Sequence, residues 1–178
     1  MFGFLKKILG SKSDKDLKEI YPLVDKINTE FDKLKGISDE DLRGKTESFK
    51  LKIKESLKET DDEIKSLKNK YEVSEGSLDE KEEILNSIDK ILEDQNKTIE
   101  NVLNEILPEA FAVVKETARR FSENGSLEVM ATDYDKALSE NKENIKIKGS
   151  KALWLNKWEA AGVSIEWNMI HYDVQLIG

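Results

Sequence analysis

Apolar residues recur at intervals of three and four along the first part of the chain, which is the spacing of one face of an α-helix. The first series consists of Leu17, Ile20, Val24, Ile27, Phe31 and Leu34. Ser13 precedes it as a capping residue, and Gly36 follows it as a stop signal. The pattern therefore predicts a helix that begins at Ser13 and ends before Gly36.

Two longer apolar series follow, and each has its own start signal. "ISDEDL" places Ser38 ahead of three acidic residues, and "SLDE" makes a capping box of Ser77 and Glu80. The series predict helices over residues 39–71 and 78–106, within a helical region that spans residues 13–107. Because a short connection containing a glycine joins the two helices, we expect a long antiparallel helical hairpin.

The pattern changes after Pro108. The stretch "PEAFAVVKETARRF" carries few charges and has apolar residues on more than one face, which predicts a buried helix over residues 108–124. Across residues 125–168 apolar and polar positions alternate as in β-strands, "TDYDKALSEN" indicates a short helix, and "KIKGSKALWL" indicates a hairpin around Gly149 and Ser150. The expected fold class is mainly α with a small antiparallel β insert (α+β).

Composition narrows the range of functions. The 178 residues include 37 acidic and 29 basic side chains, which give a net charge of -8. Such a chain repels nucleic-acid phosphates, so we expect no nucleic-acid partner. With no cysteine and a single histidine, the sequence offers no set of residues for thiol catalysis or for a transition-metal site. We therefore predict no catalytic residue and no metal ligand, and no stretch has the roughly 18 consecutive apolar residues of a membrane-spanning helix.

The opening segment, residues 1–12, combines apolar and basic side chains in an otherwise acidic protein. The residues concerned are Phe2, Phe4, Leu5, Lys6, Lys7, Ile8 and Leu9. In an anionic membrane the aromatic and aliphatic groups would enter the headgroup layer while the lysines meet lipid phosphates. A frayed first helical turn and a docking strip for a protein partner are the alternative interpretations.

Four blocks of the chain also carry a family resemblance. They are "GSKSDKDLKEIYPLVDKIN", "ISDEDLRGKTESFK", "LPEAFAVVKETARR" and "MIHYDVQLIG". In this order they resemble the amino-terminal region of the SecA family, the motor ATPases that drive preproteins through a membrane channel. Two stretches depart from the compact family pattern, one around residues 55–100 and one around residues 122–168. Both have the character of surface additions, and the sequence assigns no role to either.

The resemblance implies a role for residues 169–178 as the start of a nucleotide-binding domain. The family places an adenine-reading glutamine in this motif, and Gln175 is the matching residue. A carboxamide presents one donor and one acceptor in a plane, which suits the N6 donor and N7 acceptor of adenine. Ile170 stands where relatives often carry an arginine, and His171 is interpreted as an ordinary packed or surface histidine.

The sequence contains no G-x-x-x-x-G-K-[ST] loop to hold phosphates and magnesium. In the family that loop follows shortly after the glutamine motif. We therefore expect an amino-terminal fragment that contributes adenine recognition but does not hydrolyse ATP alone. ATP and Mg²⁺ are the cofactors that the resemblance implies for the parent protein, and we expect neither to bind tightly to this chain.

The implied partners are a SecYEG-type channel, secretory preproteins and anionic lipid, so Phe2 to Leu9 would contact the membrane or the channel. The implied location is cytoplasmic and peripheral at the cytoplasmic membrane. The alternative is a non-enzymatic helical or coiled-coil interaction protein. The heptad-like apolar stripes and the charged faces of the predicted helices support this alternative. A homodimer that buries exposed apolar surfaces is a further alternative.

Overall fold

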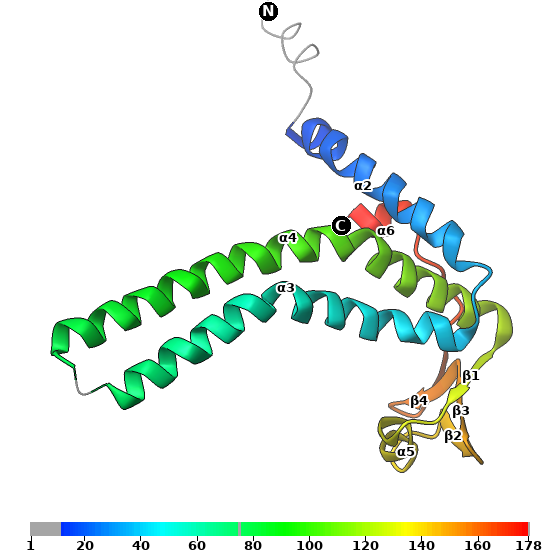
Figure 1. Ribbon diagram of the computed structural model, residues 1–178. Helices are drawn as coiled ribbons and strands as arrows, with labels where there is room; N and C mark the ends of the chain where they lie inside the picture. Colours follow the sequence, from blue (N-terminus) through cyan, green and yellow to red (C-terminus); the bar gives the residue numbers. More distant parts are fainter. Residues whose placement is uncertain (1–11, 75, 178) are drawn as a thin grey trace, which may run out of the picture. The chain divides into compact units, whose positions relative to one another are not determined.

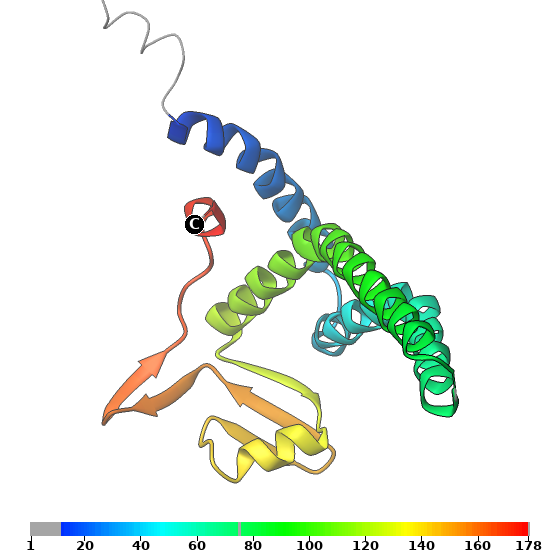
Figure 2. The ribbon, with the colours of Figure 1, turned by 90° about the vertical axis from the view of Figure 1, so that its left-hand side faces the viewer.

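The computed structural model describes the backbone of residues 12–74 and 76–177, and the side chains of this set from Leu17 onward (Figures 1 and 2). The predicted membrane- or channel-contact residues, Phe2, Phe4, Leu5, Lys6, Lys7, Ile8 and Leu9, lie outside the described residues. The chain forms two compact units. Met1–Lys45 and Pro108–Gly178 make up the first, which we call the split unit, and Thr46–Leu107 makes up the second, the hairpin unit.

The hairpin unit consists of parts of two long helices, α3 (Asp39–Val73) and α4 (Leu78–Asn124), which run antiparallel (Figure 1). Ile64 of α3 packs in one apolar cluster with Ile84 and Ile88 of α4. Further from the turn, Gln95 Nε2 of α4 donates hydrogen bonds to α3, at 2.8 Å to the Thr60 hydroxyl and 2.7 Å to the Asp61 carboxylate. These contacts confirm the antiparallel hairpin that the apolar spacing predicts.

Helix α4 continues through Pro108, although the sequence favours one helix that ends at residue 106 and another that starts at residue 108. A proline inside a helix costs about 3 kcal/mol because it removes one amide donor and crowds the preceding turn. Burial offsets that cost, since Ile106, Ala112 and Val113 are each less than 10% exposed, and each large aliphatic side chain contributes roughly 1.5–3 kcal/mol when fully buried. The sequence also predicts that the segment 108–124 is buried. In the structure it is buried on one side only, because Phe111 and Val114 are 41% and 57% exposed.

The split unit brings together α2 (Lys12–Leu34), the first turns of α3, the last turns of α4 and the β-strands. Its buried apolar side chains include Val24, Ile27, Leu34, Leu42, Ala112, Ala118, Leu127, Val129, Ile145 and Ala152. They come from segments far apart in the sequence, which explains why the unit contains both ends of the described chain.

Three strands form an antiparallel sheet in the order β1-β3-β2. These are β1 (Ser126–Met130), β2 (Ile145–Lys148) and β3 (Lys151–Leu155), and α5 (Asp133–Ser139) connects β1 to β2 beside the sheet (Figure 2). Gly149, with a φ of 60°, and Ser150 form the turn between β2 and β3, as the sequence predicts. The mainly α fold with a small antiparallel β part is therefore confirmed.

A second, two-stranded antiparallel ribbon follows, made of β4 (Lys157–Ala160) and β5 (Val163–Glu166). Its two-residue turn has positive φ at both positions, 52° at Ala161 and 77° at Gly162. Two consecutive positive φ values are typical of the type I′ turn, whose twist matches that of a hairpin.

Asn156 lies between β3 and β4, where the chain enters and leaves the β region. The residue is 4% exposed. Its N–H donates to the Gly125 carbonyl at 2.9 Å, and its carbonyl accepts from the Trp167 N–H at 2.8 Å. Its side-chain amide donates to the carbonyls of Phe121 at 3.1 Å and Trp167 at 3.3 Å. One buried asparagine thus joins the end of α4 to the exit of β5.

Candidate functional site

The segment with the predicted adenine-reading residue forms a short helix, α6 (Asp173–Ile177). Gln175 is exposed, and its side-chain Oε1 accepts a hydrogen bond from the Tyr172 N–H at 2.9 Å. A glutamine at the third helical position that reaches back to the residue before the helix makes one half of a capping box. The carboxamide oxygen is therefore engaged in holding the first turn of α6.

Two residues from distant helices hold the start of α6. Asn28 Nδ2 of α2 donates to the Asp173 carboxylate at 3.1 Å, and Lys115 Nζ of α4 donates to Asn28 Oδ1 at 2.8 Å. The Lys115 ammonium also lies 3.6 Å from Asp173 Oδ1 and 5.1 Å from the centre of the Phe31 ring. Because Lys115 is only 9% exposed, its charge is held between these groups, and α6 is fixed against α2 and α4.

A cavity of about 690 Å³ adjoins this anchor and is bordered by Lys115, Ser122 and residues 168–174. Its volume falls within the range of small-molecule sites. His171 is part of its wall, and His171 Nδ1 is buried without a hydrogen-bond partner among the described residues. The His171 ring lies 6.3 Å from the Trp167 ring. The histidine is thus packed against an aromatic side chain, and Ile170 adds an apolar group to the same wall.

A buried ionic cluster centred on Arg120 supports the end of α4. Arg120 is 5% exposed, and its guanidinium donates to the Glu116 carboxylate at 2.8 Å and to the Asp39 carboxylate at 2.6 Å. It also donates to the carbonyl of Leu34, the last residue of α2, at 3.0 Å, and to that of Ile37, in the connection between α2 and α3, at 2.8 Å. Burial raises the pKa of Glu116, but hydrogen bonds from Arg119 and Arg120 outweigh burial, so the pKa of Glu116 is lowered overall. One arginine thereby joins α2, α3 and α4 within the split unit.

A second ionic cluster attaches α5 and the sheet to α3. The Asp135 side chain is fully buried and lies 2.8 Å from the Arg43 guanidinium. Thr132 N–H donates to Asp135 Oδ2 at 2.8 Å, and Trp154 Nε1 donates to Oδ1 at 3.2 Å. Burial raises the pKa of Asp135, yet the hydrogen bonds from Arg43 and Thr132 are stronger, and the net result is a pKa lowered to about 2. The carboxylate is a charged structural anchor rather than a proton-transfer group at neutral pH.

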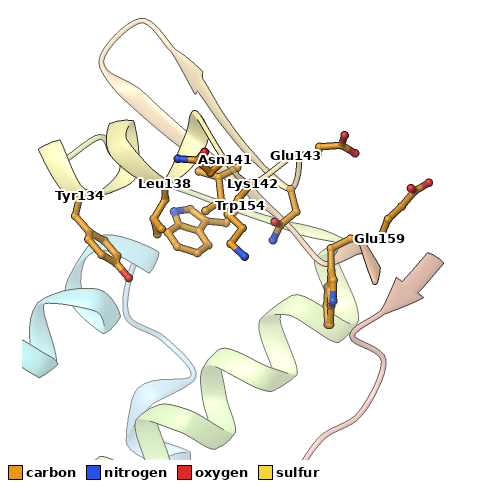
Figure 3. Close-up of a pocket in the computed structure, with 10 residues that line it drawn as sticks. Tyr134, Leu138, Asn141, Lys142, Glu143, Trp154 and Glu159 are labelled. Atoms are coloured by element: carbon orange, nitrogen blue, oxygen red, sulfur yellow. The ribbon is translucent and has the colours of Figure 1, made fainter. Parts of the chain in front are cut away.

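Figure 3 shows another cavity of about 690 Å³, which lies beside α5 and the strands. Tyr134, Leu138 and Trp154 supply aromatic and aliphatic surface, and Lys142 and Glu159 supply opposite charges. Because Trp154 also donates to Asp135, its indole is held in place by the ionic cluster. The cavity shares no lining residue with the one beside α6.

The structure thus places Gln175 on an anchored helix, and the predicted residues from Phe2 to Leu9 lie outside the described residues. Sequence reasoning missed Asn28, Lys115 and Asp173, since each is an ordinary polar residue in its own segment. The low charge of the stretch from residue 108 to 118 is the only signal that could have drawn attention to Lys115. Among the described residues, no group of three or more His, Cys, Asp or Glu residues is arranged to hold a metal ion, and no helix is long and apolar enough to cross a bilayer.

Comparison with known proteins identifies the class of domain to which this arrangement belongs. Residues 5–178 match the SecA DEAD-like domain. Because the match covers nearly the whole sequence, the chain belongs to the SecA family.

Curated relatives agree with this assignment. The chain is 47% identical over 179 aligned residues to the protein translocase subunit SecA of Cytophaga hutchinsonii, which covers 100% of the chain. It is 47% identical over 175 residues to that of Porphyromonas gingivalis and 45% identical over 174 residues to that of Christiangramia forsetii, with 98% of the chain covered in both. The chain spans 16% of the length of each of these relatives. No solved structure matches the chain significantly.

Proposed function

We propose that this chain is the amino-terminal part of a preprotein-translocating ATPase and that Gln175 contributes recognition of the adenine base of ATP. The family assignment over residues 5–178 supports this proposal. The position of Gln175 on α6 supports it further, because Asn28 and Lys115 hold the start of that helix in place. A side chain that reads a base must project from a fixed backbone.

The residues present fit the base-recognition part of a nucleotide site. The Gln175 carboxamide has the donor and acceptor that the N6 and N7 edge of adenine requires, and the residue is exposed. Its oxygen already accepts from Tyr172 N–H, and a carbonyl oxygen has a second lone pair that can accept from the adenine amino group. Groups that hold the phosphates and Mg²⁺ would come from a phosphate loop, which this sequence does not contain. When bound, ATP supplies the free energy of phosphoanhydride hydrolysis.

The test of Gln175 uses the parent ATPase with its phosphate loop and compares equilibrium binding of ATP and GTP. We expect Gln175→Ala to reduce the preference for ATP about tenfold to a hundredfold, because a bidentate contact to a base edge contributes about 1–3 kcal/mol of discrimination. Gln175→Glu is the matched variant, since it keeps the acceptor for Tyr172 N–H but loses the donor for N7. If Gln175→Glu retains full ATP preference, Gln175 only caps α6 and the proposed role is wrong.

The isolated chain gives a second test. Because most of the affinity for a nucleoside triphosphate comes from contacts to its phosphates and metal, we expect isothermal titration of the 178-residue chain with Mg-ATP to show weak binding or none. Tight, saturable binding would mean that the chain holds the phosphates by means other than a phosphate loop.

We further propose that the parent protein acts on secretory preproteins with a SecYEG-type channel and is a cytoplasmic protein peripheral to the membrane. The relatives bear the name protein translocase subunit, and the opening segment carries Lys6 and Lys7 among apolar residues. Co-sedimentation with vesicles containing anionic lipid should show binding that falls as salt rises and that disappears when residues 1–11 are deleted. Binding that is independent of salt, or of the deletion, would reject lipid contact by this segment.

A further inference from the structure

The part of α4 within the hairpin unit carries two neighbouring rows of apolar side chains. The first row is buried and includes Ile84, Ile88, Val102 and Ile106, all at most 8% exposed. Its members Ile84 and Ile88 pack with Ile64 of α3. The second row, which we call the outer leucine row, has a seven-residue spacing and consists of Leu78, Leu85, Leu92 and Ile99, followed by Leu103. Its four leucines are 87%, 46%, 44% and 46% exposed in chain order, whereas Ile99 is half-buried.

Two apolar rows are more than a two-helix hairpin requires. A helix that meets one neighbour in a coiled coil needs only the narrow stripe of heptad positions a and d. A helix that packs inside a bundle carries an additional apolar position, which faces a second neighbour. In the described part of the hairpin unit α3 is the one helix beside α4. The two apolar rows of α4 therefore indicate a second neighbouring helix, which would pack along the outer leucine row.

The charges beside the row indicate the chemistry of that helix. Glu82 and Asp89 follow Leu78 and Leu85 by four residues, so they lie on the same face of α4 as the row. From Leu78 to Leu107 there are nine acidic residues and three lysines. A partner with lysines or arginines on both sides of its apolar stripe would neutralise this excess, whereas a second copy of the acidic hairpin would bring like charges together.

We propose that the outer leucine row is a docking surface for an amphipathic, basic helix of another protein. The row extends over 26 residues, from Leu78 to Leu103, which corresponds to about 37 Å of helix. Leucines at intervals of seven residues would interlock with apolar residues of the partner, and Glu82 and Asp89 would pair with its basic flanks. The outer leucine row belongs to the hairpin unit, whereas Gln175 belongs to the split unit.

The proposal is tested with the full 178-residue chain and a synthetic peptide. The probe is a fluorescein-labelled 28-residue helix with leucine at positions a and d of each heptad and lysine at the flanking positions. A second peptide has glutamate in place of every lysine, and a third has the composition of the first in scrambled order. Fluorescence anisotropy at physiological salt should show saturable binding of the first peptide, with at least tenfold weaker binding of the other two.

Variants of the chain locate the binding surface. We expect the double variant Leu85→Gln/Leu92→Gln to weaken binding of the lysine peptide at least tenfold, while its helical content by circular dichroism stays the same. Leu51→Gln is the matched control, because Leu51 is a 54% exposed leucine of α3 outside the row, and we expect a change of less than twofold. Glutamine keeps helix propensity and adds no charge, so either effect reports on apolar contact.

Three results would overturn the proposal. One is the absence of saturable binding of the lysine peptide, and another is equal binding by the double variant, which would mean attraction by net charge alone. The third concerns a second copy of the chain: if sedimentation velocity shows a dimer that the Leu85→Gln/Leu92→Gln variant abolishes, the row is a homodimer interface instead.

Discussion

The guanidinium of Arg43 on α3 meets the buried carboxylate of Asp135 on α5 at 2.8 Å, although 92 positions separate the two residues in the sequence. Asp135 also accepts from Thr132 and Trp154, so one carboxylate connects a helix, a helix cap and a strand. This pair joins α3 to the β region, together with the hydrogen bonds that Arg43 and Glu40 make with the backbone of Met130.

Replacing Asp135 by asparagine should lower the free energy of unfolding of the split unit by about 2 kcal/mol, because a buried charge-assisted pair is lost while the volume is kept. Urea unfolding followed by Trp fluorescence measures the change. Asp133→Asn is the control, since Asp133 pairs with Lys136 in solvent, and we expect no measurable effect. Equal effects of the two variants would mean that the buried pair of Asp135 contributes no more to the free energy of unfolding than the exposed pair of Asp133.

Acid should weaken this link in a defined pH window. The pKa of Asp135 is about 2 in the folded chain, against 3.8 for an ordinary aspartate. A lowered folded-state pKa gives stability that is fully present above pH 4 and is lost as the pH falls toward 2, and the shift corresponds to about 2 kcal/mol. Other carboxylates titrate in the same window, so the measurement is the difference between the wild-type chain and Asp135→Asn. We expect that difference to shrink from pH 5 to pH 2, and a constant difference would contradict the lowered pKa.

Arg120→Lys should destabilise the split unit by about 2–3 kcal/mol. A lysine ammonium is compact and cannot reach Asp39, Glu116 and the carbonyls of both Leu34 and Ile37 from one position. Arg119→Lys is the matched control, because the contacts of Arg119 to Glu116 and Glu123 stay within α4. Urea unfolding should show a loss for Arg119→Lys less than half that for Arg120→Lys. Similar losses would indicate that the bonds to α2 and α3 contribute little.

Lys115→Met should release the glutamine segment while leaving the helices folded. Methionine fills a similar volume but cannot donate to Asn28 or attract Asp173. Hydrogen exchange followed by mass spectrometry should show at least tenfold faster exchange in residues 172–177, with little change in the hairpin unit. Lys97→Met, which removes an exposed pair with Asp94, should leave both regions unchanged. If exchange near α6 is the same in both variants, Lys115 is not the anchor.

Gln95→Leu should leave the hairpin equally stable or stabilise it by about 1 kcal/mol. Gln95 is 7% exposed and lies in the apolar interface, and an apolar residue of similar size removes its desolvation cost while Thr60 and Asp61 regain contact with water. Gln95→Ala should instead cost about 1–2 kcal/mol, because it leaves a cavity as well as unpaired groups. Thermal unfolding of the two variants measures both effects. A strong loss in Gln95→Leu would show that the hydrogen bonds to α3 outweigh burial.

Regular spacing made much of the fold predictable. The apolar stripes of α2, α3 and α4, the caps at Ser38 and Ser77, and the turn at Gly149 are all local signals, and the structure has the expected elements at each of them. Continuation of α4 through Pro108 was not predicted, because proline is a local stop signal and the packing that overrides it comes from other segments.

The candidate site was predictable only in part, since Gln175 is identified by resemblance and not by periodicity. Its anchor consists of Asn28, Lys115 and Asp173, which are far apart in sequence and lie in segments without a motif that links them. The two ionic clusters, around Arg120 and around Asp135, likewise join residues from segments that no sequence motif links. A single polar residue carries no periodic signal, so pairs such as Arg43 with Asp135 appear only when the chain is folded.

The hydrogen bonds of Asn156 close the β region at its base, because the end of α4 at Phe121 and Gly125 and the exit at Trp167 are joined through this one side chain and its backbone. Gly125, Asn156 and Trp167 thus meet at one junction, so residues 126–155 and 157–166 form two loops that each begin and end there. A change of length at the turn between β2 and β3 or at the turn between β4 and β5 would leave this junction and the pair of Arg43 with Asp135 in place. Insertions are consequently expected to accumulate at these two exposed turns, and the same two turns are suitable sites for grafting a foreign domain.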